Sequence, residues 1–259
     1  MQILRQNYVN TTTQLEVNTN TSTAGNVFIP DTRFQFASDN FANDATTVTM
    51  RINFAETLTV DRIALVSHNL KSFRVYYNGI TANTFALTAT ANTSTTHYSN
   101  NSDTSHYFEC TPVGCTSVSI EMYSTIVANQ NKYLGYLVIS EEVTNFDGRV
   151  PSADGYTPTL DTQAIKHRLS DGGTRIQTLE DKWHVQLSFD YLTQTARDEL
   201  KAIFDDHSEI IFCPFGTSTG WDAVIFPCVW EGGFNFFKYS DNASDAGFSG
   251  SLTLLETPQ

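Results

Sequence analysis

One short segment constrains the fold of this chain more than any other. From Trp183 to Tyr191, apolar and polar residues alternate without a break. Successive side chains of a β-strand point to opposite faces, so the alternation predicts a strand with one buried and one exposed face. Further on, Leu200, Ile203 and Phe204 have the spacing of one helical face. The sequence therefore predicts a strand that leads directly into a helix.

The expected helix has suitable residues at its start. Thr193 or Thr195 can cap its first turn, and Asp198 and Glu199 follow where carboxylates interact favourably with the helix dipole. The pattern ends around residues 205–208, where we expect the helix to end.

Four apolar segments after the helix predict further strands, which gives the order β-α-β-β-β-β. Pro227 marks an edge or a bulge, because proline cannot donate to a strand ladder. One helix is expected to pack on a small, mostly antiparallel sheet. The four segments are EIIFCPF (209–215), WDAVIFPCVW (221–230), GGFNFFKY (232–239) and GFSGSLTLLET (247–257).

The first half of the chain has short alternating segments separated by polar loops. Short strands at this spacing predict a β-sandwich, and Asn78-Gly79 predicts a hairpin turn because both residues tolerate positive φ. The expected strands are TVTMRINF (47–54), VDRIALVSHNL (60–70), SFRVYYNG (72–79), TSVSIEMY (116–123) and YLGYLVIS (133–140).

These patterns predict a mainly β protein with two domains. Residues 1–145 are expected to form a jelly-roll-like β-sandwich, and residues 176–259 a small antiparallel β-sheet domain with one packed helix. Between them, residues 146–175 are rich in Gly, Pro and Asp, which predicts a linker or an extended arm.

The composition limits the classes of function. The formal net charge is −13, which disfavours a protein that clamps nucleic acid, because phosphate must be neutralised by basic side chains. No segment approaches the ~18 apolar residues of a membrane-spanning helix, and the N-terminus lacks the apolar core of a signal peptide. We therefore expect no membrane insertion, and synthesis in the cytoplasm.

No established catalytic motif is present in the sequence. The closest candidates are Asp205-Asp206-His207 and His167 with Asp171, but the first lies at the expected helix C-terminus, where a histidine interacts favourably with the helix dipole. The interpretation is that the chain is not an enzyme and needs no cofactor.

A zinc site is the alternative role for part of the cysteine content. Four residues separate Cys110 from Cys115, and His97 and His106 are nearby in the sequence. Structural zinc sites, however, usually have two pairs of ligands with tighter spacings. Cys213 and Cys228 are expected to pack as small buried residues. The sequence therefore predicts no metal site.

The element order of residues 176–257 resembles the ring-forming domain of phage distal tail and minor tail proteins. The signature positions of this resemblance are Trp183, Leu192-Thr193, Phe212, Pro214 and Leu254-Leu255-Glu256.

The first half of the chain is similar to galactose-binding-like (discoidin-type) jelly rolls, through VDRIALVSHNLKSFRVYYNG (60–79).

The resemblance implies a structural virion protein of a long-tailed phage. Such a tail-tip subunit would assemble in the host cytoplasm into a homo-oligomeric ring, a hexamer being favoured, between tail-tube and tail-tip hub proteins. DNA would pass through without specific binding. Candidate subunit-interface residues are Trp183, Phe189, Tyr191, Trp221, Trp230 and Phe236.

The alternative hypothesis is a carbohydrate-binding adhesin module on a particle or a secreted assembly. Tyr76 and Tyr77 are its candidate glycan contacts, and a host-surface glycan would be the partner. Because side chains alternate along a strand, one of these two adjacent tyrosines is expected to face the core.

Overall fold

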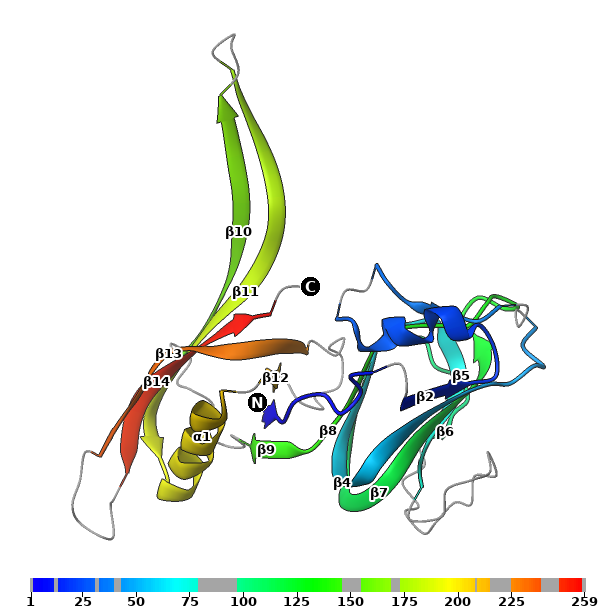
Figure 1. The fold of residues 1–259 in the computed structure, drawn as a ribbon, viewed down its shortest axis with the longest axis horizontal. Helices are drawn as coiled ribbons and strands as arrows, with labels where there is room; N and C mark the ends of the chain where they lie inside the picture. The colour runs from blue at the N-terminus through cyan, green and yellow to red at the C-terminus, as the bar shows by residue number, and fades with distance from the viewer. Residues whose placement is uncertain are drawn as a thin grey trace. The chain divides into compact units, whose positions relative to one another are not determined.

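The protein is mainly β, as the sequence predicts, with two seven-stranded assemblies of strands and one α-helix (Figure 1). The computed structural model describes residues 2–11, 14–30, 33–39, 43–78, 97–145, 155–168, 173–207, 209–214, 225–238 and 247–257. The chain divides into two compact units. One, the sandwich unit, comprises Leu4–Glu142, Cys213–Ile225 and Gln259; the other, the arm unit, comprises Met1–Ile3, Val143–Phe212 and Phe226–Pro258.

The sandwich unit is a set of antiparallel strands in the order β3-β8-β4-β7-β5-β6, with β2 paired to β4. A 3-10 helix, η2 (Thr21–Phe28), precedes β3. The strands are β2 (Leu15–Val17), β3 (Phe36–Ala37), β4 (Val48–His68), β5 (Leu70–Asn78), β6 (His97–Tyr98), β7 (His106–Thr125) and β8 (Tyr133–Ser140).

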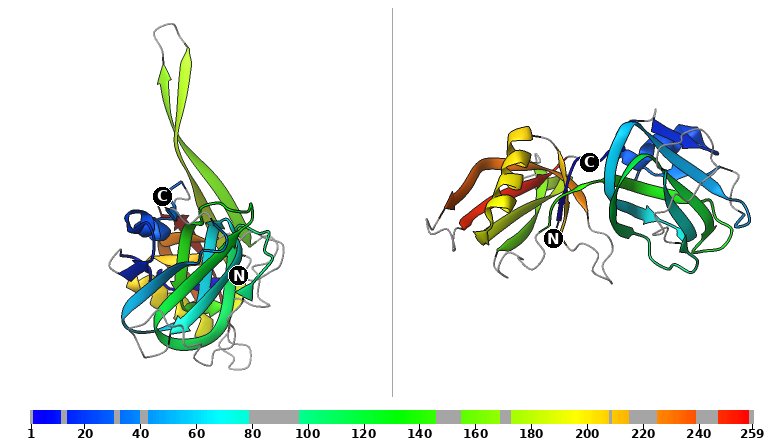
Figure 2. Two further views of the ribbon diagram at one scale, coloured as in Figure 1. Left: turned by 90° about the vertical axis from the view of Figure 1, so that its right-hand side faces the viewer. Right: turned by 90° about the horizontal axis from the view of Figure 1, so that it is seen from below.

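One long strand replaces two that the sequence predicts as separate, and its partner β7 is longer than the predicted strand at 116–123. The expected strands at 47–54 and 60–70 form the single strand β4, which pairs with β7 along both parts. The register shifts between Asn53 and Leu58 and again between Val60 and Arg62. Such bulges bend a strand, so β4 and β7 curve around one apolar core (Figure 2). The predicted turn at Asn78-Gly79 lies at the limit of the described residues.

A pair of histidines, His68 fully buried and His106 partly buried, joins β4 to β7. The backbone N–H of Leu70 donates to Nδ1 of His68 at 3.1 Å, so the neutral His68 ring carries its proton on Nε2. That nitrogen lies 3.0 Å from Nδ1 of His106, and the planes of the two rings are 21° apart. Burial, and then the neighbouring His106, lower the pKa of His68 to about 3.

We predict that acid destabilises the sandwich unit through His68. Its folded-state pKa lies below the ordinary value of 6.5, so the stabilisation is complete above pH 6.5 and is lost as the pH falls toward 3. His68→Asn, which keeps an acceptor for Leu70, should lose less stability between pH 6.5 and 4 than the wild type. Urea unfolding at several pH values tests this, with the exposed His167→Asn as the control. Equal pH slopes for all three proteins would contradict the prediction.

The sheet of the arm unit has the order β10-β11-β14-β13-β12-β1-β9, all antiparallel where the register is known. The helix α1 (Gln194–Asp206) follows β11. The strands are β1 (Gln2–Leu4), β9 (Glu142–Asn145), β10 (Tyr156–Arg168), β11 (Thr174–Leu192), β12 (Ile210–Cys213), β13 (Phe226–Lys238) and β14 (Phe248–Glu256).

Residues 146–175, expected to be a linker or an extended arm, contain the strand β10 of the outer hairpin. Other features of this sheet differ from the sequence prediction. The expected strands at 221–230 and 232–239 form one strand, β13, whose register against β14 shifts between Glu231 and Asn235, around Gly232 with φ +87°. The N-terminal residues of the chain form β1, which joins this sheet. The predicted domain limit at residue 145 coincides with the last residue of β9, which belongs to the same sheet.

The helix α1 begins and ends where the sequence predicts. Thr193 is its N-cap, and its hydroxyl accepts from the N–H of Ala196 at 3.3 Å. Leu200 and Ile203 are buried in the core of the arm unit. None of the helices in the described part of the chain has the length and apolarity needed to cross a membrane.

Candidate functional site

The most distinctive surface of the molecule is the outer part of the β10–β11 hairpin. The strand β10 pairs with β11 as far as Arg168 and Thr174, but β14 pairs with β11 only between His184 and Leu192. Residues 160–168 and 174–183, named here the arm, therefore extend past β14 as a two-stranded ribbon (Figure 1). At ~3.3 Å per residue, the ten residues from Thr174 to Trp183 span about 30 Å.

A buried carboxylate marks the point where the arm leaves the sheet. Glu256 is the last residue of β14, and its Oε2 accepts from the backbone N–H of Trp183 at 2.8 Å. This N–H is the next group of β11 after the residues that pair with β14. The side chain of Glu256 thus satisfies a backbone donor that the strand itself no longer reaches.

The apolar face of the sheet continues into the arm. Leu160 and Trp183 are directly opposite each other, on the same face as Val185 and Leu187, which are fully buried. The exposed fraction rises to 36% for Trp183 and 48% for Leu160. Exposed apolar pairs of this kind are typical of contact surfaces, where tryptophan is enriched.

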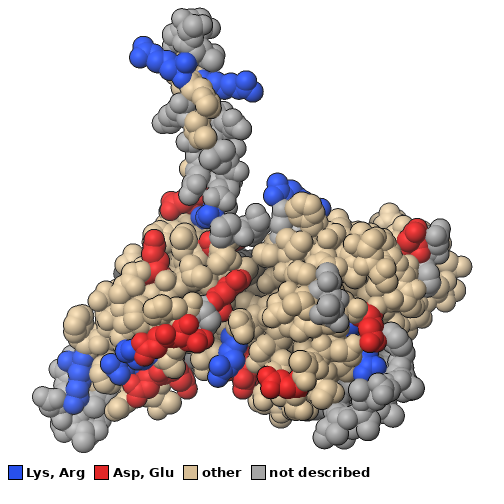
Figure 3. All heavy atoms as spheres, in the orientation of Figure 1, with Lys and Arg blue, Asp and Glu red and all other residues tan. Residues whose placement is uncertain are grey.

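The outer end of the arm is basic. His167, Arg168 and Arg175 are exposed there, and Figure 3 shows Lys and Arg side chains in blue at this end of the hairpin. Within the described residues, neither Arg168 nor Arg175 has an ion-pair partner. Residues 164–177 contain three basic residues and one acidic residue, net +2, so the remainder of the −13 chain carries −15.

The predicted interface residues lie in different environments. Trp183 and Tyr191 are exposed at the two places where the buried face of β11 ends. Phe189 and Phe236 are buried in the core with ring centroids 6.3 Å apart, so their side chains lie inside the unit. Trp230 packs against that core, with its ring 5.4 Å from Phe204. The remaining candidate, Trp221, lies outside the described residues.

The predicted glycan contact Tyr76 is only 7% exposed. Its hydroxyl accepts from Nη1 of Arg74 at 2.6 Å and donates to Oε2 of Glu121 at 3.1 Å, and Tyr123 also donates to Glu121. The Arg74 guanidinium lies 5.4 Å from the Tyr76 ring centre. Stacking on a sugar requires an accessible ring, and Tyr76 does not offer one here. The side chain of Tyr77 lies outside the described part of the structure.

The candidate catalytic residues form ordinary helix contacts. Asp205 pairs with Lys201 one turn earlier, and Nδ1–H of His207 donates to the Phe204 carbonyl at the helix end. Among the described residues, no three His, Cys, Asp or Glu side chains are arranged to hold a metal ion. The side chains of Cys110 and His97 are outside that set.

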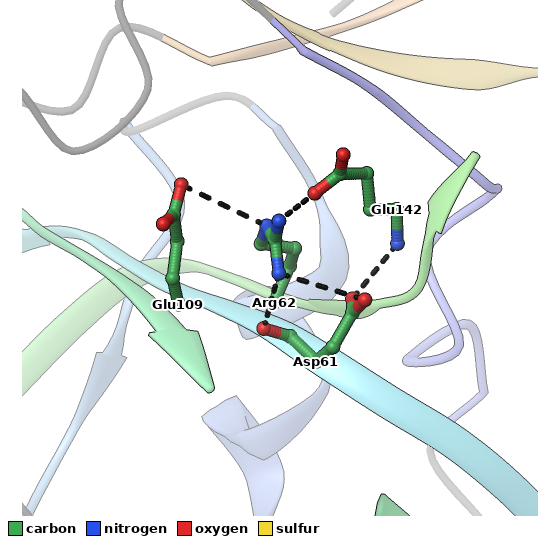
Figure 4. A network of polar contacts seen from close by, with 4 residues as sticks. All are labelled: Asp61, Arg62, Glu109 and Glu142. Atoms are coloured by element: carbon green, nitrogen blue, oxygen red, sulfur yellow. Dashed lines mark hydrogen bonds and ion pairs between the residues drawn. The ribbon is translucent and has the colours of Figure 1, made fainter. Parts of the chain in front are cut away.

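A cluster that sequence inspection misses surrounds Arg62 (Figure 4). Its Nη1 donates to the backbone oxygen of Asp61 at 3.0 Å, its Nε lies 4.0 Å from Glu109, and its Nη2 pairs with Glu142. The N–H of Glu142 donates to Oδ1 of Asp61 at 2.8 Å. Burial, opposed by Arg62, raises the pKa of Asp61. One guanidinium thus holds three carboxylates at the end of the sandwich unit.

We predict that Arg62→Met destabilises the protein by about 3 kcal/mol, because it leaves the buried carboxylate of Asp61 and the largely buried carboxylate of Glu142 without a cation. Arg5→Met is the control, since Arg5 pairs with Glu141 at 3.2 Å but its side chain is 59% exposed. Exposed pairs contribute less than about 1 kcal/mol. Urea unfolding of both variants measures the difference, and similar losses for the two would contradict a structural role for the Arg62 cluster.

Comparison with known proteins gives structural similarity without a family. No protein-family model matches the chain, and no curated protein matches it. Among solved structures, it is similar to chitosan-binding module 1 of a chitosanase/glucanase from Paenibacillus sp. IK-5, at 12% identity and a TM-score of 0.42, covering 52% of this chain and 98% of the module.

Two further structures have similar values. Chitosan-binding module 2 of the same Paenibacillus enzyme, in complex with chitotriose, has 11% identity and a TM-score of 0.41, over 49% of this chain and 95% of the module. A family 32 carbohydrate-binding module from C. perfringens, in complex with galactose, has 10% identity and a TM-score of 0.39, over 50% and 96%. A likeness at this level carries no argument about function.

Proposed function

We propose that this chain is a structural subunit that assembles with further copies of itself through the arm. The observation that carries the proposal is the exposed pair Leu160–Trp183 on a ribbon that pairs with no third strand in the described part of the chain. A two-stranded hairpin is marginally stable in water, and covering its apolar face against a neighbour would stabilise it.

On this proposal the arm contacts a different part of the neighbouring copy. Such a contact is head-to-tail, and head-to-tail contacts form closed rings or open filaments. A ring agrees with the resemblance of residues 176–257 to phage distal tail proteins. On this proposal the chain is a tail-tip component of a virion, in contact with tail-tube and hub proteins. The net charge of −13 would let DNA pass without binding.

We predict that the wild-type protein is oligomeric and that Leu160→Ser with Trp183→Ser makes it monomeric, because the apolar face of the arm is then polar. Light scattering gives the masses, and circular dichroism checks that both proteins are folded. Phe237→Ser is the control, since Phe237 is 70% exposed on β13 but lies outside the arm. A monomeric wild type, or a double variant of unchanged mass, would overturn the proposal.

Glycan binding by the sandwich unit is the alternative function. The similar solved structures include two chitosan-binding modules, one of them in complex with chitotriose, and a carbohydrate-binding module in complex with galactose. Of the two candidate tyrosines, Tyr76 is buried, so Tyr77, whose side chain lies outside the described part of the structure, stays the candidate contact.

A glycan array with the full chain distinguishes the two functions. For a structural subunit we expect no selective signal. Selective binding that is lost in Tyr77→Ala and kept in Tyr133→Ala, a half-buried tyrosine on β8, would favour the alternative.

A further inference from the structure

The C-terminal end of α1 has an unfavourable charge. Asp205 and Asp206 are in its last turn, and Glu209 follows, whereas the last turn contains no basic residue. The helix dipole places partial negative charge at this end, so carboxylates there are destabilising and a cation is stabilising. Asp205 pairs with Lys201, but Asp206 and Glu209 are exposed and no ion pair is formed by either within the described residues.

The arm has the opposite charge and cannot neutralise the helix of its own chain. From Arg175 to Leu192, where β11 ends and α1 follows, the extended strand covers roughly 55 Å. The start of α1 and the outer end of the arm are thus at opposite ends of one strand (Figure 1). The acidic C-terminal end of α1 lies about 20 Å from that start, so it stays more than about 30 Å from the basic end of the arm. Arg168 and Arg175 are exposed, and nothing in the described part of the arm unit lies within ion-pairing distance of them.

We infer that the basic end of the arm in one copy docks on the acidic end of α1 in a second copy. The inference rests on the proposed assembly through the arm and names the surface that receives it. Arginine side chains suit this contact, because the guanidinium group binds carboxylates through two parallel hydrogen bonds. The charge of the chain selects the partner: outside residues 164–177 each copy carries −15, and the acidic helix end is part of it.

The two members of this contact lie on one continuous frame of β11 and α1, since β11 ends at Leu192 and Thr193 is the N-cap of the helix. Each copy therefore has a basic end, at the outer end of the arm, and an acidic end, at the C-terminal end of α1. Copies add in one direction, which is the heterologous arrangement that a ring requires. The apolar pair Leu160–Trp183, at the base of the arm, adds a burial term that does not depend on charge.

Charge reversal tests the inference in the full-length protein. The tip-reversed variant carries Arg168→Glu and Arg175→Glu; the helix-reversed variant carries Asp206→Arg and Glu209→Arg. We expect each alone to weaken association about tenfold or more, because like charges then meet. We expect an equimolar mixture of the two variants to assemble again, as does a chain with all four changes. Arg5→Glu with Lys238→Glu is a control with the same total change in charge as the tip-reversed variant.

The outcomes separate this inference from the proposed function. If Leu160→Ser with Trp183→Ser dissociates the oligomer but the charge reversals do not, the arm assembles the protein and the inference is overturned. If the tip-reversed variant dissociates and neither the mixture nor the four-change chain recovers, the arm meets a different acidic partner and the inference is again overturned. A monomeric wild type overturns both. Recovery in the mixture, weakened by added salt, supports both.

Discussion

The arm unit depends on one mismatch of length between neighbouring strands. The strand β14 ends at Glu256, whereas β11 and β10 continue beyond it. Inside the region of overlap, α1 and the sheet bury a common apolar core. Beyond it, no layer formed by the described residues covers the same face of the hairpin, and Leu160 and Trp183 become exposed. The end of a single strand therefore separates a core from an interaction surface along one continuous apolar face.

Charge is distributed according to the same division between inside and outside. Where charged groups are buried, as around Arg62, they are paired and fix the local backbone, because an unpaired buried charge costs several kcal/mol. Where they are exposed at the two ends of the β11–α1 frame, they carry opposite signs. Exposed charges contribute little to the stability of a single copy, so selection of a partner is a better physical account of their separation.

The sequence predicts which segments form strands and helices better than it predicts where a strand ends or where its buried part ends. Alternation from Trp183 to Tyr191 predicts the strand, and Thr193 predicts the helix start, because both signals depend on nearby residues. Alternation alone does not say how far the core extends along a strand. It therefore gives Trp183 and Phe189 the same status, although one is exposed and the other buried. The long strand β4 is missed for a related reason: a bulge keeps a strand continuous while it breaks the periodicity.

The Arg62 cluster and the two ends of the β11–α1 frame were beyond sequence inspection for another reason. Arg62, Glu109 and Glu142 are brought together only by pairing between β4, β7 and the segment after β8. Likewise, the basic end of the arm and the acidic end of α1 are separated in space only because the continuous strand β11 lies between them. A flexible linker with the same composition would let the arm fold back onto its own helix and neutralise it. Because β11 is continuous from the arm to Leu192, contact between copies is the favourable way to pair these groups.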